Sequence, residues 1–331
     1  MMKFKGLIAA TVTALLTMPS AYAADKTIAF ISADNAISFY KYGMDAAVEA
    51  GKALNVDVLT YSSKSDPSQE LANVQDAITK GAKGIVMYAV SLSSERAAIA
   101  QAKRAGVPIF LEYGYDPSIL KDTAGIMQMD AEASGKVLGD WVAKKLPEGE
   151  IAIVPGLLGR GEVELYVKGF KEGVAANPKL KVVAEAPADW NRQKAMEVTS
   201  QILTAHPNVQ AIFVNNEDMT VGASIAIERA GKAAVVKVVS MNGSPEAPSL
   251  INAKKLAVTY ANPPSIASVL SLRLLLGVLD GKVPPGKYYD APTLLVDANN
   301  VGKIQRWDAT AEDIKEWIKM PLPAPVSPPS H

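Results

Sequence analysis

Apolar residues follow two alternating patterns along the chain. Short, mostly β-branched runs predict buried strands at residues 27–31, 56–61, 84–90, 108–113, 151–155, 182–185, 211–214, 236–241 and 294–296. Longer segments with apolar residues at every third or fourth position predict helices at residues 39–54, 66–78, 94–104, 137–146, 162–176, 192–205, 219–230, 245–253 and 311–319. Strands that alternate with helices over hundreds of residues indicate parallel sheets with helices on both faces.

The number of these strand–helix units predicts more than one sheet. The pattern restarts after residue 130, and the 331-residue chain exceeds the usual size of a single core. We therefore predict an α/β protein with two doubly wound parallel-sheet lobes in tandem. A (β/α)₈ barrel is the alternative topology with the same alternation of elements.

The first 23 residues have the three-part layout of a secretory signal peptide. Lys3 and Lys5 give a positive start, an uncharged apolar run follows at residues 6–18, and Ala21 and Ala23 are the small residues before a cleavage site. The apolar run is shorter than the roughly 20 residues that span a bilayer. We expect cleavage after Ala23 and export of the mature protein.

Cysteine and charge content narrow the location and the partners. The chain has no cysteine, which excludes disulfides, thiolate metal sites and the usual lipid attachment of exported lipoproteins. We therefore expect the protein in the periplasm of a two-membrane bacterium rather than on a cell surface.

The charges of the chain nearly balance. The full sequence has 34 basic and 34 acidic residues, and removal of Lys3 and Lys5 with the signal peptide leaves 32 basic and 34 acidic residues in the mature chain. This balance gives no attraction for nucleic acid or anionic membrane.

Histidine content argues against catalysis. The chain has two histidines, His206 in a predicted helix-end turn and His331 at the last position. A Ser-His-Asp triad or a multi-histidine metal site is therefore not expected. We predict no catalytic residues, no metal and no cofactor.

Polar and aromatic residues gather where the predicted strands end. These residues are Asn35, Phe39, Tyr40, Glu112, Tyr113, Glu164, Trp190, Asn216, Asn242 and Asn262. Ligands of open α/β sheets bind outside the carboxyl ends of the strands. Aromatic rings can stack on the C–H faces of a polyhydroxylated solute, while amides and carboxylates bond its hydroxyls. The pattern predicts a site for a small polar solute; each residue could alternatively be a helix cap or turn residue.

The mature chain resembles the ribose-binding-protein type of periplasmic receptor, which is the solute-binding part of ABC importers (type I periplasmic binding proteins). The resemblance extends from Lys26 to about Val296 and is carried by residues 69–76, 187–192, 203–213, 215–219 and 238–243. It implies two lobes joined by a three-strand hinge, closure of the lobes on the solute, and docking of the closed form on a membrane permease.

The resemblance also implies domain boundaries. Hinge crossings are expected near residues 128–130, 260–263 and 289–292. The first lobe then comprises residues 24–129 and 263–290, and the second lobe comprises residues 130–262 and 291–319. The proline-rich residues 320–331 predict an extended, mobile tail to which we assign no function.

The pocket positions carry over from the family unevenly. Phe39 and Tyr40 match the aromatic pair of the first lobe, Trp190 matches the stacking aromatic of the second lobe, and Asn216 matches a family asparagine. The remaining positions depart from the family pattern. Glu112-Tyr113 stands in place of an Asp-Arg pair, and Glu164 stands in place of an arginine. Asn242 stands where the family has an aspartate, Asn262 where it has a glutamine, and Ile37 where it has an asparagine. The departures remove two forked arginine donors to sugar oxygens.

The substitutions lead to the expected function. We expect a monomeric receptor that delivers a sugar or polyol other than ribose to an ABC import permease. A receptor for a cationic or amino-bearing solute is the alternative, because two carboxylates beside aromatic faces would suit a cation. A hydrolase using Glu112 and Glu164 as a carboxylate pair is a third hypothesis. Presentation of the closed form to a chemoreceptor is also compatible with the sequence.

Overall fold

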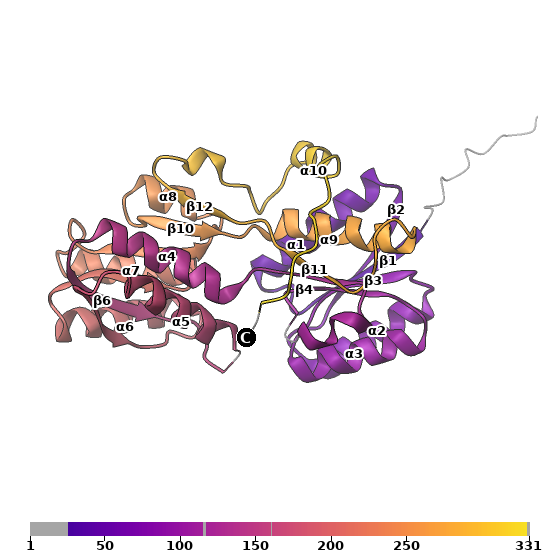
Figure 1. The fold of residues 1–331 in the computed structure, drawn as a ribbon, viewed down its shortest axis with the longest axis horizontal. Coiled ribbons are helices and arrows are strands. Elements are labelled where there is room, and N and C mark those ends of the chain that lie inside the picture. The colour runs from indigo at the N-terminus through magenta and orange to yellow at the C-terminus, as the bar shows by residue number, and fades with distance from the viewer. Residues whose placement is uncertain (1–25, 115–116, 160, 330–331) are drawn as a thin grey trace, which may run out of the picture.

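The computed structural model describes residues 26–329 except 115, 116 and 160. Two six-stranded sheets form two lobes that lie end to end, as Figure 1 shows. The two-lobed α/β architecture predicted from the sequence is confirmed, and the single barrel is excluded because the strands form two separate sheets. The predicted signal peptide at residues 1–23 lies outside the described residues.

The sheet of the first lobe is parallel throughout. Its strands, in spatial order, are β11 (Lys287–Asp290), β5 (Gly125–Gln128), β4 (Ile109–Glu112), β3 (Gly84–Tyr88), β1 (Lys26–Ser32) and β2 (Val56–Ser62). Its central strands are apolar on both faces, as expected for a parallel sheet between two helical layers. In β1, Ile28 and Phe30 belong to one core cluster, whereas Ala29 and Ile31 belong to another.

Helices cover both faces of the first sheet (Figure 1). The helices and turns of this lobe are α1 (Ser38–Ala53), α2 (Pro67–Thr79), α3 (Leu92–Arg104), the 3₁₀ helix η1 (Pro117–Asp122), α9 (Pro264–Leu279) and α10 (Ala311–Trp317). Helices α1 and α9 share the core cluster of Ile28 and Phe30, and α2 and α3 share that of Ala29 and Ile31. The first lobe therefore has three layers, with the sheet between α1 and α9 on one face and α2 and α3 on the other.

The second sheet has the same design with one reversed strand. Its strands, in spatial order, are β12 (Leu294–Asp297), β10 (Val258–Ala261), β9 (Lys237–Asn242), β8 (Val209–Val214), β6 (Gly149–Val154) and β7 (Leu180–Glu185). Strand β12 is antiparallel to β10, and all other pairs are parallel. The helices are α4 (Ala131–Lys145), α5 (Glu162–Val174), α6 (Arg192–Ala205), α7 (Glu217–Arg229), α8 (Ala247–Asn252) and the 3₁₀ helix η2 (Val301–Lys303).

Helices α4 and α5 pack backbone against backbone. A Cβ atom on Gly135 would lie 2.1 Å from the carbonyl oxygen of Tyr166, and one on Gly169 would lie 1.9 Å from that of Glu132. Real Cβ atoms do not approach carbonyl oxygens so closely, so these positions require glycine. The contact holds the helix pair tightly over one face of the second sheet.

The chain passes between the lobes more than three times. It goes from β5 to α4, returns from β10 to α9, and goes again from β11 to β12. It then returns to the first lobe, because α10 packs on α1 and α9. This differs from the expected division, in which residues 291–319 all stayed with the second lobe. The reason is the apolar face of α10, whose Ile314 and Trp317 are buried where the helix packs on α1 and α9.

The proline-rich tail follows the edge of the first sheet as far as the structure describes it. The guanidinium of Arg273 donates to the carbonyl oxygens of Trp317 and Met320 at its start. Further along, the N–H of Val326 donates a 2.9 Å hydrogen bond to the carbonyl of Tyr288 on β11. The tail therefore covers an edge strand that would otherwise offer unpaired backbone groups. Among the described residues, no helix is both long enough and apolar enough to cross a membrane.

Candidate functional site

An aromatic cluster lies at the carboxyl ends of the first-lobe strands. Phe39 and Tyr40 are in the first turn of α1, directly after β1, Tyr88 ends β3, and Tyr113 follows β4. The ring of Phe39 meets those of Tyr40 and Tyr113 edge to face, at centroid distances of 5.7 and 5.6 Å. Tyr88 stacks on Tyr113 at 5.7 Å with an interplanar angle of 9°. The structure thus brings together three predicted site residues and adds Tyr88.

Tyr113 also connects the two sheets. Its hydroxyl donates a 2.7 Å hydrogen bond to Oδ1 of Asn262, which follows β10 and is 2% exposed. Tyr113 adopts a left-handed backbone conformation with φ of 55°. Burial, together with the nearby charge of Glu112, raises the pKa of Tyr113. The hydroxyl therefore stays protonated and keeps its role as a donor.

Glu112 lies behind this cluster rather than on its surface. The side chain is 1% exposed, and its Oε2 accepts a 2.9 Å hydrogen bond from Ser268 on α9. Burial raises the pKa of Glu112 to about 7, although the hydroxyls of Tyr88, Ser268 and Ser271 oppose the shift. The structure therefore places Glu112 where it supports Tyr88 and α9.

Three predicted residues of the second lobe lie at separate strand ends. Trp190 follows β7 and packs over Gly156, where a Cβ atom would lie 2.4 Å from the indole. Glu164 is exposed on the first turn of α5, and its Oε1 accepts a 2.5 Å hydrogen bond from the N–H of Gly159. Asn216 caps α7 by accepting a 2.8 Å hydrogen bond from the N–H of Met219. Each of these side chains therefore has a local structural partner.

The remaining two predicted residues organise loops after β9 and β1. Asn242 has φ of 92°, and its carbonyl accepts a 2.9 Å hydrogen bond from the N–H of Asn262. The N–H of Asn35 donates to Ser62 Oγ at 3.1 Å, and its side chain accepts from the hydroxyl of Ser32. Asn242 thereby joins the group formed by Tyr113 and Asn262. Asn35 belongs to the loop that leads into α1.

Sequence reasoning did not single out two aromatic residues that complete the cluster. Tyr88 ends a predicted strand, so the rule that selected the other strand-end residues would also have found it. Trp307 lies in the irregular segment between β12 and α10, where no periodicity marks it. Its ring meets Phe39 edge to face at 5.3 Å, and its Nε1–H lies 3.3 Å from the carbonyl oxygen of Asn242.

Helix α5 brings second-lobe groups close to the aromatic cluster. The charge of Glu162 raises the pKa of both Tyr166 and Tyr113, in addition to the larger effect of burial. The charges of Tyr113 and Tyr40 of the first lobe also raise the pKa of Tyr166. The N-terminal turns of α5 therefore lie within electrostatic range of the aromatic cluster.

A second buried carboxyl group lies in the second lobe. Oε1 of Glu217 accepts hydrogen bonds from Thr259 Oγ1 at 2.6 Å and from the N–H of Gly243 at 2.9 Å. Burial raises the pKa of Glu217 to about 7. Glu217 thus ties the start of α7 to the ends of β9 and β10, where Asn242 and Asn262 are located.

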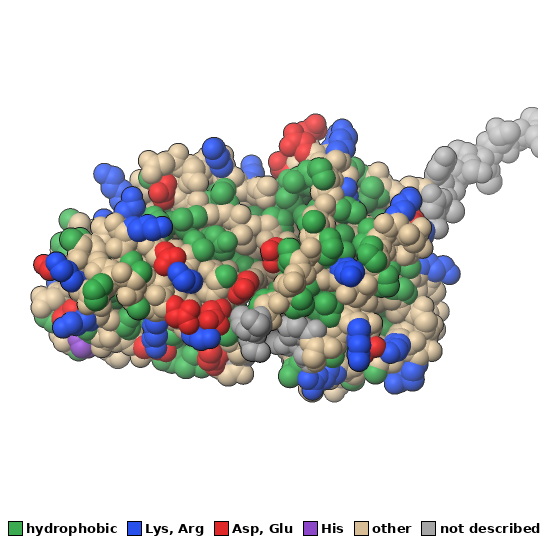
Figure 2. Space-filling view, viewed as in Figure 1, with side chains coloured by type: hydrophobic (Ala, Val, Ile, Leu, Met, Phe, Trp, Pro, Cys, Tyr) green, Lys and Arg blue, Asp and Glu red, His purple; other side chains and the backbone are tan. Residues whose placement is uncertain are grey.

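Neither a metal site nor a basic patch stands out on the described part of the molecule. Within residues 26–329, apart from the three internal gaps, no group of three or more acidic or histidine side chains could hold a metal ion. Figure 2 shows acidic and basic side chains mixed over the visible face, without one basic patch. These observations direct attention to the aromatic and amide groups at the strand ends.

Two α/β lobes that meet at their strand ends define the class of two-lobed binding proteins, and comparisons identify the family. A model described as a periplasmic binding protein domain matches residues 28–283. The ribose import binding protein of Salmonella typhimurium is 32% identical over 290 residues, which are 87% of this chain and 96% of that protein. The chain belongs to the periplasmic binding protein family.

Two further proteins illustrate the range of similarity. The D-allose-binding periplasmic protein of Escherichia coli is 30% identical over 240 residues, or 70% of this chain and 77% of that protein. A solved solute-binding protein of an ABC transporter from Actinobacillus succinogenes, with bound D-allose, has a TM-score of 0.78. At 23% identity, with 84% of this chain and 100% of that chain covered, it confirms the fold.

Proposed function

We propose that the protein is a periplasmic receptor that captures a sugar or polyol between its lobes and delivers it to an ABC import permease. The observation that carries the proposal is the cluster of Phe39, Tyr40 and Tyr113 beside Asn262 and Asn242, where the strand ends of the two lobes meet. Aromatic faces and amides are the groups that recognise a polyhydroxylated solute.

The proposed solute is neutral and differs from ribose. Tyr113 occupies a position where ribose-binding relatives are expected to have an arginine, and its hydroxyl is already committed to Asn262. Glu112 is buried against Ser268, so it adds no exposed carboxylate to the first lobe. Recognition would then depend on stacking and on neutral amides. Relatives named for ribose and for D-allose are 32% and 30% identical, which supports the solute class rather than one sugar.

A cationic or amino-bearing solute is the second candidate. It is supported by Glu162 and Glu164 on the first turn of α5, of which Glu162 acts electrostatically on Tyr113. Carboxylates beside tyrosine faces would attract a cation. Glu164→Gln should weaken binding of a cation strongly and leave binding of a neutral polyol within about threefold.

The setting of the receptor is part of the proposal. Residues 1–23 would direct export and be removed after Ala23, and the mature protein would act as a monomer without nucleic acid. The site would bind its solute without chemical turnover. Release of product from a glycoside incubated with the pure protein would support a hydrolase instead. Binding of the closed form to a chemoreceptor would be an additional use of the same site.

A thermal-shift screen of sugars, polyols and amines tests the proposed function. A solute that binds only the folded state raises the melting temperature by mass action. We expect a shift with a sugar or polyol, and loss of most of that shift in Trp190→Ala and Phe39→Ala. Trp141→Ala serves as the matched control, because Trp141 is a partly buried tryptophan of α4 that packs against the core and beside Lys145 of its own helix. Shifts with amines and none with any carbohydrate would favour the second candidate.

A further inference from the structure

The segment between β12 and α10 makes a fourth passage between the lobes. It leaves the second sheet after Asp297 and reaches the helices of the first lobe at Ala311. Trp307 lies in this passage and is 5% exposed although no regular element holds it. A buried tryptophan in an irregular segment requires specific partners, and the structure provides them on both lobes.

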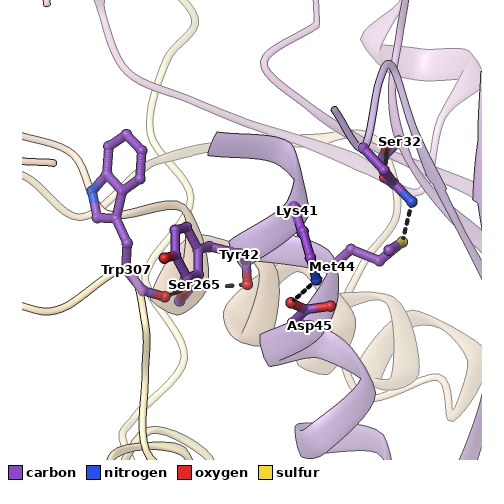
Figure 3. A network of polar contacts seen from close by, with 8 residues as sticks. Ser32, Lys41, Tyr42, Met44, Asp45, Ser265 and Trp307 are labelled. Carbon is purple, nitrogen blue, oxygen red and sulfur yellow. Dashed lines mark hydrogen bonds and ion pairs between the residues drawn. The ribbon is translucent and has the colours of Figure 1, made fainter. Parts of the chain in front are cut away.

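The first-lobe partners of Trp307 are on α1 and α9. Its ring meets Phe39 edge to face at 5.3 Å and 81°, and Tyr42 at 6.3 Å and 69°. Ser265 on α9 donates its hydroxyl to the carbonyl of Trp307, and the same hydroxyl lies 3.3 Å from the carbonyl oxygen of Tyr42. Figure 3 shows Ser265 between these two carbonyl groups, with the indole extending away from them.

The second-lobe partner is the end of β9. The indole Nε1–H of Trp307 donates a 3.3 Å hydrogen bond to the carbonyl of Asn242. That carbonyl also accepts a hydrogen bond from the backbone N–H of Asn262, whose side-chain Oδ1 accepts one from the hydroxyl of Tyr113. Three residues earlier, Ile304 packs beside Gly243, where a Cβ atom would lie 3.1 Å from its Cδ1. The segment is thus fixed to both lobes within a few residues.

We propose that Trp307 is a positioning residue that holds Phe39 in place and ties the first lobe to the strand end at Asn242. The three hinge strands fix the axis of the lobe motion, and the Trp307 contacts limit how far the lobes separate. The effect on Phe39 rests on the proposed solute site; the effect on the lobe separation does not. A more closed unliganded protein binds more tightly, because less of the binding energy goes into closure.

The lobe separation can be measured without any ligand. Because the sequence has no cysteine, Ser93→Cys on α3 and Gln193→Cys on α6 give a clean pair of labelling sites at strand-end helices of the two lobes. We expect Trp307→Ala to move the energy-transfer distribution toward longer distances. Trp307→Phe keeps a ring that can contact Phe39 and Tyr42 but loses the N–H that bonds Asn242, so it should also move the distribution toward longer distances. Trp141→Ala should leave it unchanged.

The position of Phe39 is tested by a double-mutant cycle with the carbohydrate found in the thermal-shift screen. Trp307→Ala should weaken binding about tenfold, and the part of this loss that acts through Phe39 should disappear in the Phe39→Ala background. Circular dichroism melting identifies any variant that fails to fold, and Trp307→Phe then carries the test. A distance distribution that is unchanged in Trp307→Ala, binding by Trp307→Phe as weak as binding by Trp307→Ala, or fully independent losses in the cycle would overturn the proposal. If no carbohydrate binds, the proposed function fails while the distance measurement still decides the role of Trp307.

Discussion

The hydroxyl of Tyr113 in the first lobe donates a 2.7 Å hydrogen bond to Asn262 at the hinge crossing after β10. Because Asn262 is buried, replacing Tyr113 with phenylalanine leaves a polar group without its donor. We expect Tyr113→Phe to lower the free energy of unfolding by about 1–2 kcal/mol in urea denaturation. Tyr260→Phe is the matched control, since its hydroxyl bonds Thr293 at an exposed position. Equal effects of the two changes would contradict the role given to Tyr113.

The close contact of α4 and α5 gives a prediction about stability. Gly169→Ala should reduce the free energy of unfolding by about 3 kcal/mol, because the new Cβ atom meets the carbonyl of Glu132 at 1.9 Å and the helices must separate. Gly302→Ala is the control, since nothing lies within 4 Å of a Cβ atom there. Denaturant titration of both variants checks the packing. An equally small loss of stability in Gly169→Ala and Gly302→Ala would show that α4 and α5 are not in backbone contact.

The buried carboxyl groups of Glu112 and Glu217 predict a pH dependence. Each pKa is raised from 4.5 to about 7 in the folded protein. Below pH 4.5 both folded and unfolded states hold the proton; between pH 4.5 and 7 only the unfolded state releases it. Each group therefore contributes its full stabilisation at low pH. That contribution, about 3 kcal/mol of unfolding free energy per group, is lost as the pH rises to about 7.

Melting curves measured from pH 4.5 to 7.5 test this dependence. Glu112→Gln and Glu217→Gln have no proton to release. The stability of each variant relative to the parent should therefore increase as the pH rises. The comparison with the parent removes the contribution of other titrating groups. A parent-minus-variant difference that does not change with pH would show that these carboxyl groups are charged in the folded protein.

The tail contact at Val326 predicts a small, position-specific effect. Val326→Pro removes the N–H that donates to the carbonyl of Tyr288, so it should lower the free energy of unfolding by about 1 kcal/mol. Val326→Ala keeps the N–H, and the valine side chain is exposed, so this variant should be nearly neutral. Urea denaturation distinguishes them. Similar stabilities for the two variants would mean that the tail is not held on β11.

Most of the fold could be predicted because it depends on local periodicity. The apolar runs of the parallel strands and the one-sided helices gave two α/β lobes. The return of α10 to the first lobe could not be predicted, because an apolar face on a seven-residue helix does not say which surface covers it. The glycine contacts of α4 and α5 were also missed, since they depend on how two helices approach each other.

The candidate site was predicted less completely than the fold. Strand-end reasoning found Phe39, Tyr40 and Tyr113, because the carboxyl ends of parallel strands meet at one edge. It could not tell that Glu112 turns into the core toward Ser268, since a strand-end side chain can face either layer. Trp307 was missed because its place depends on a passage between the lobes that no sequence pattern marks.

Calorimetric titration of the pure protein with the carbohydrates of the thermal-shift screen measures solute binding itself. We predict saturable binding of a sugar or polyol other than ribose, with one site per chain and without turnover. Phe39→Ala should weaken this binding at least tenfold, with circular dichroism checking that the variant is folded. Absence of binding by every carbohydrate, or unchanged affinity in Phe39→Ala, would contradict the proposed site.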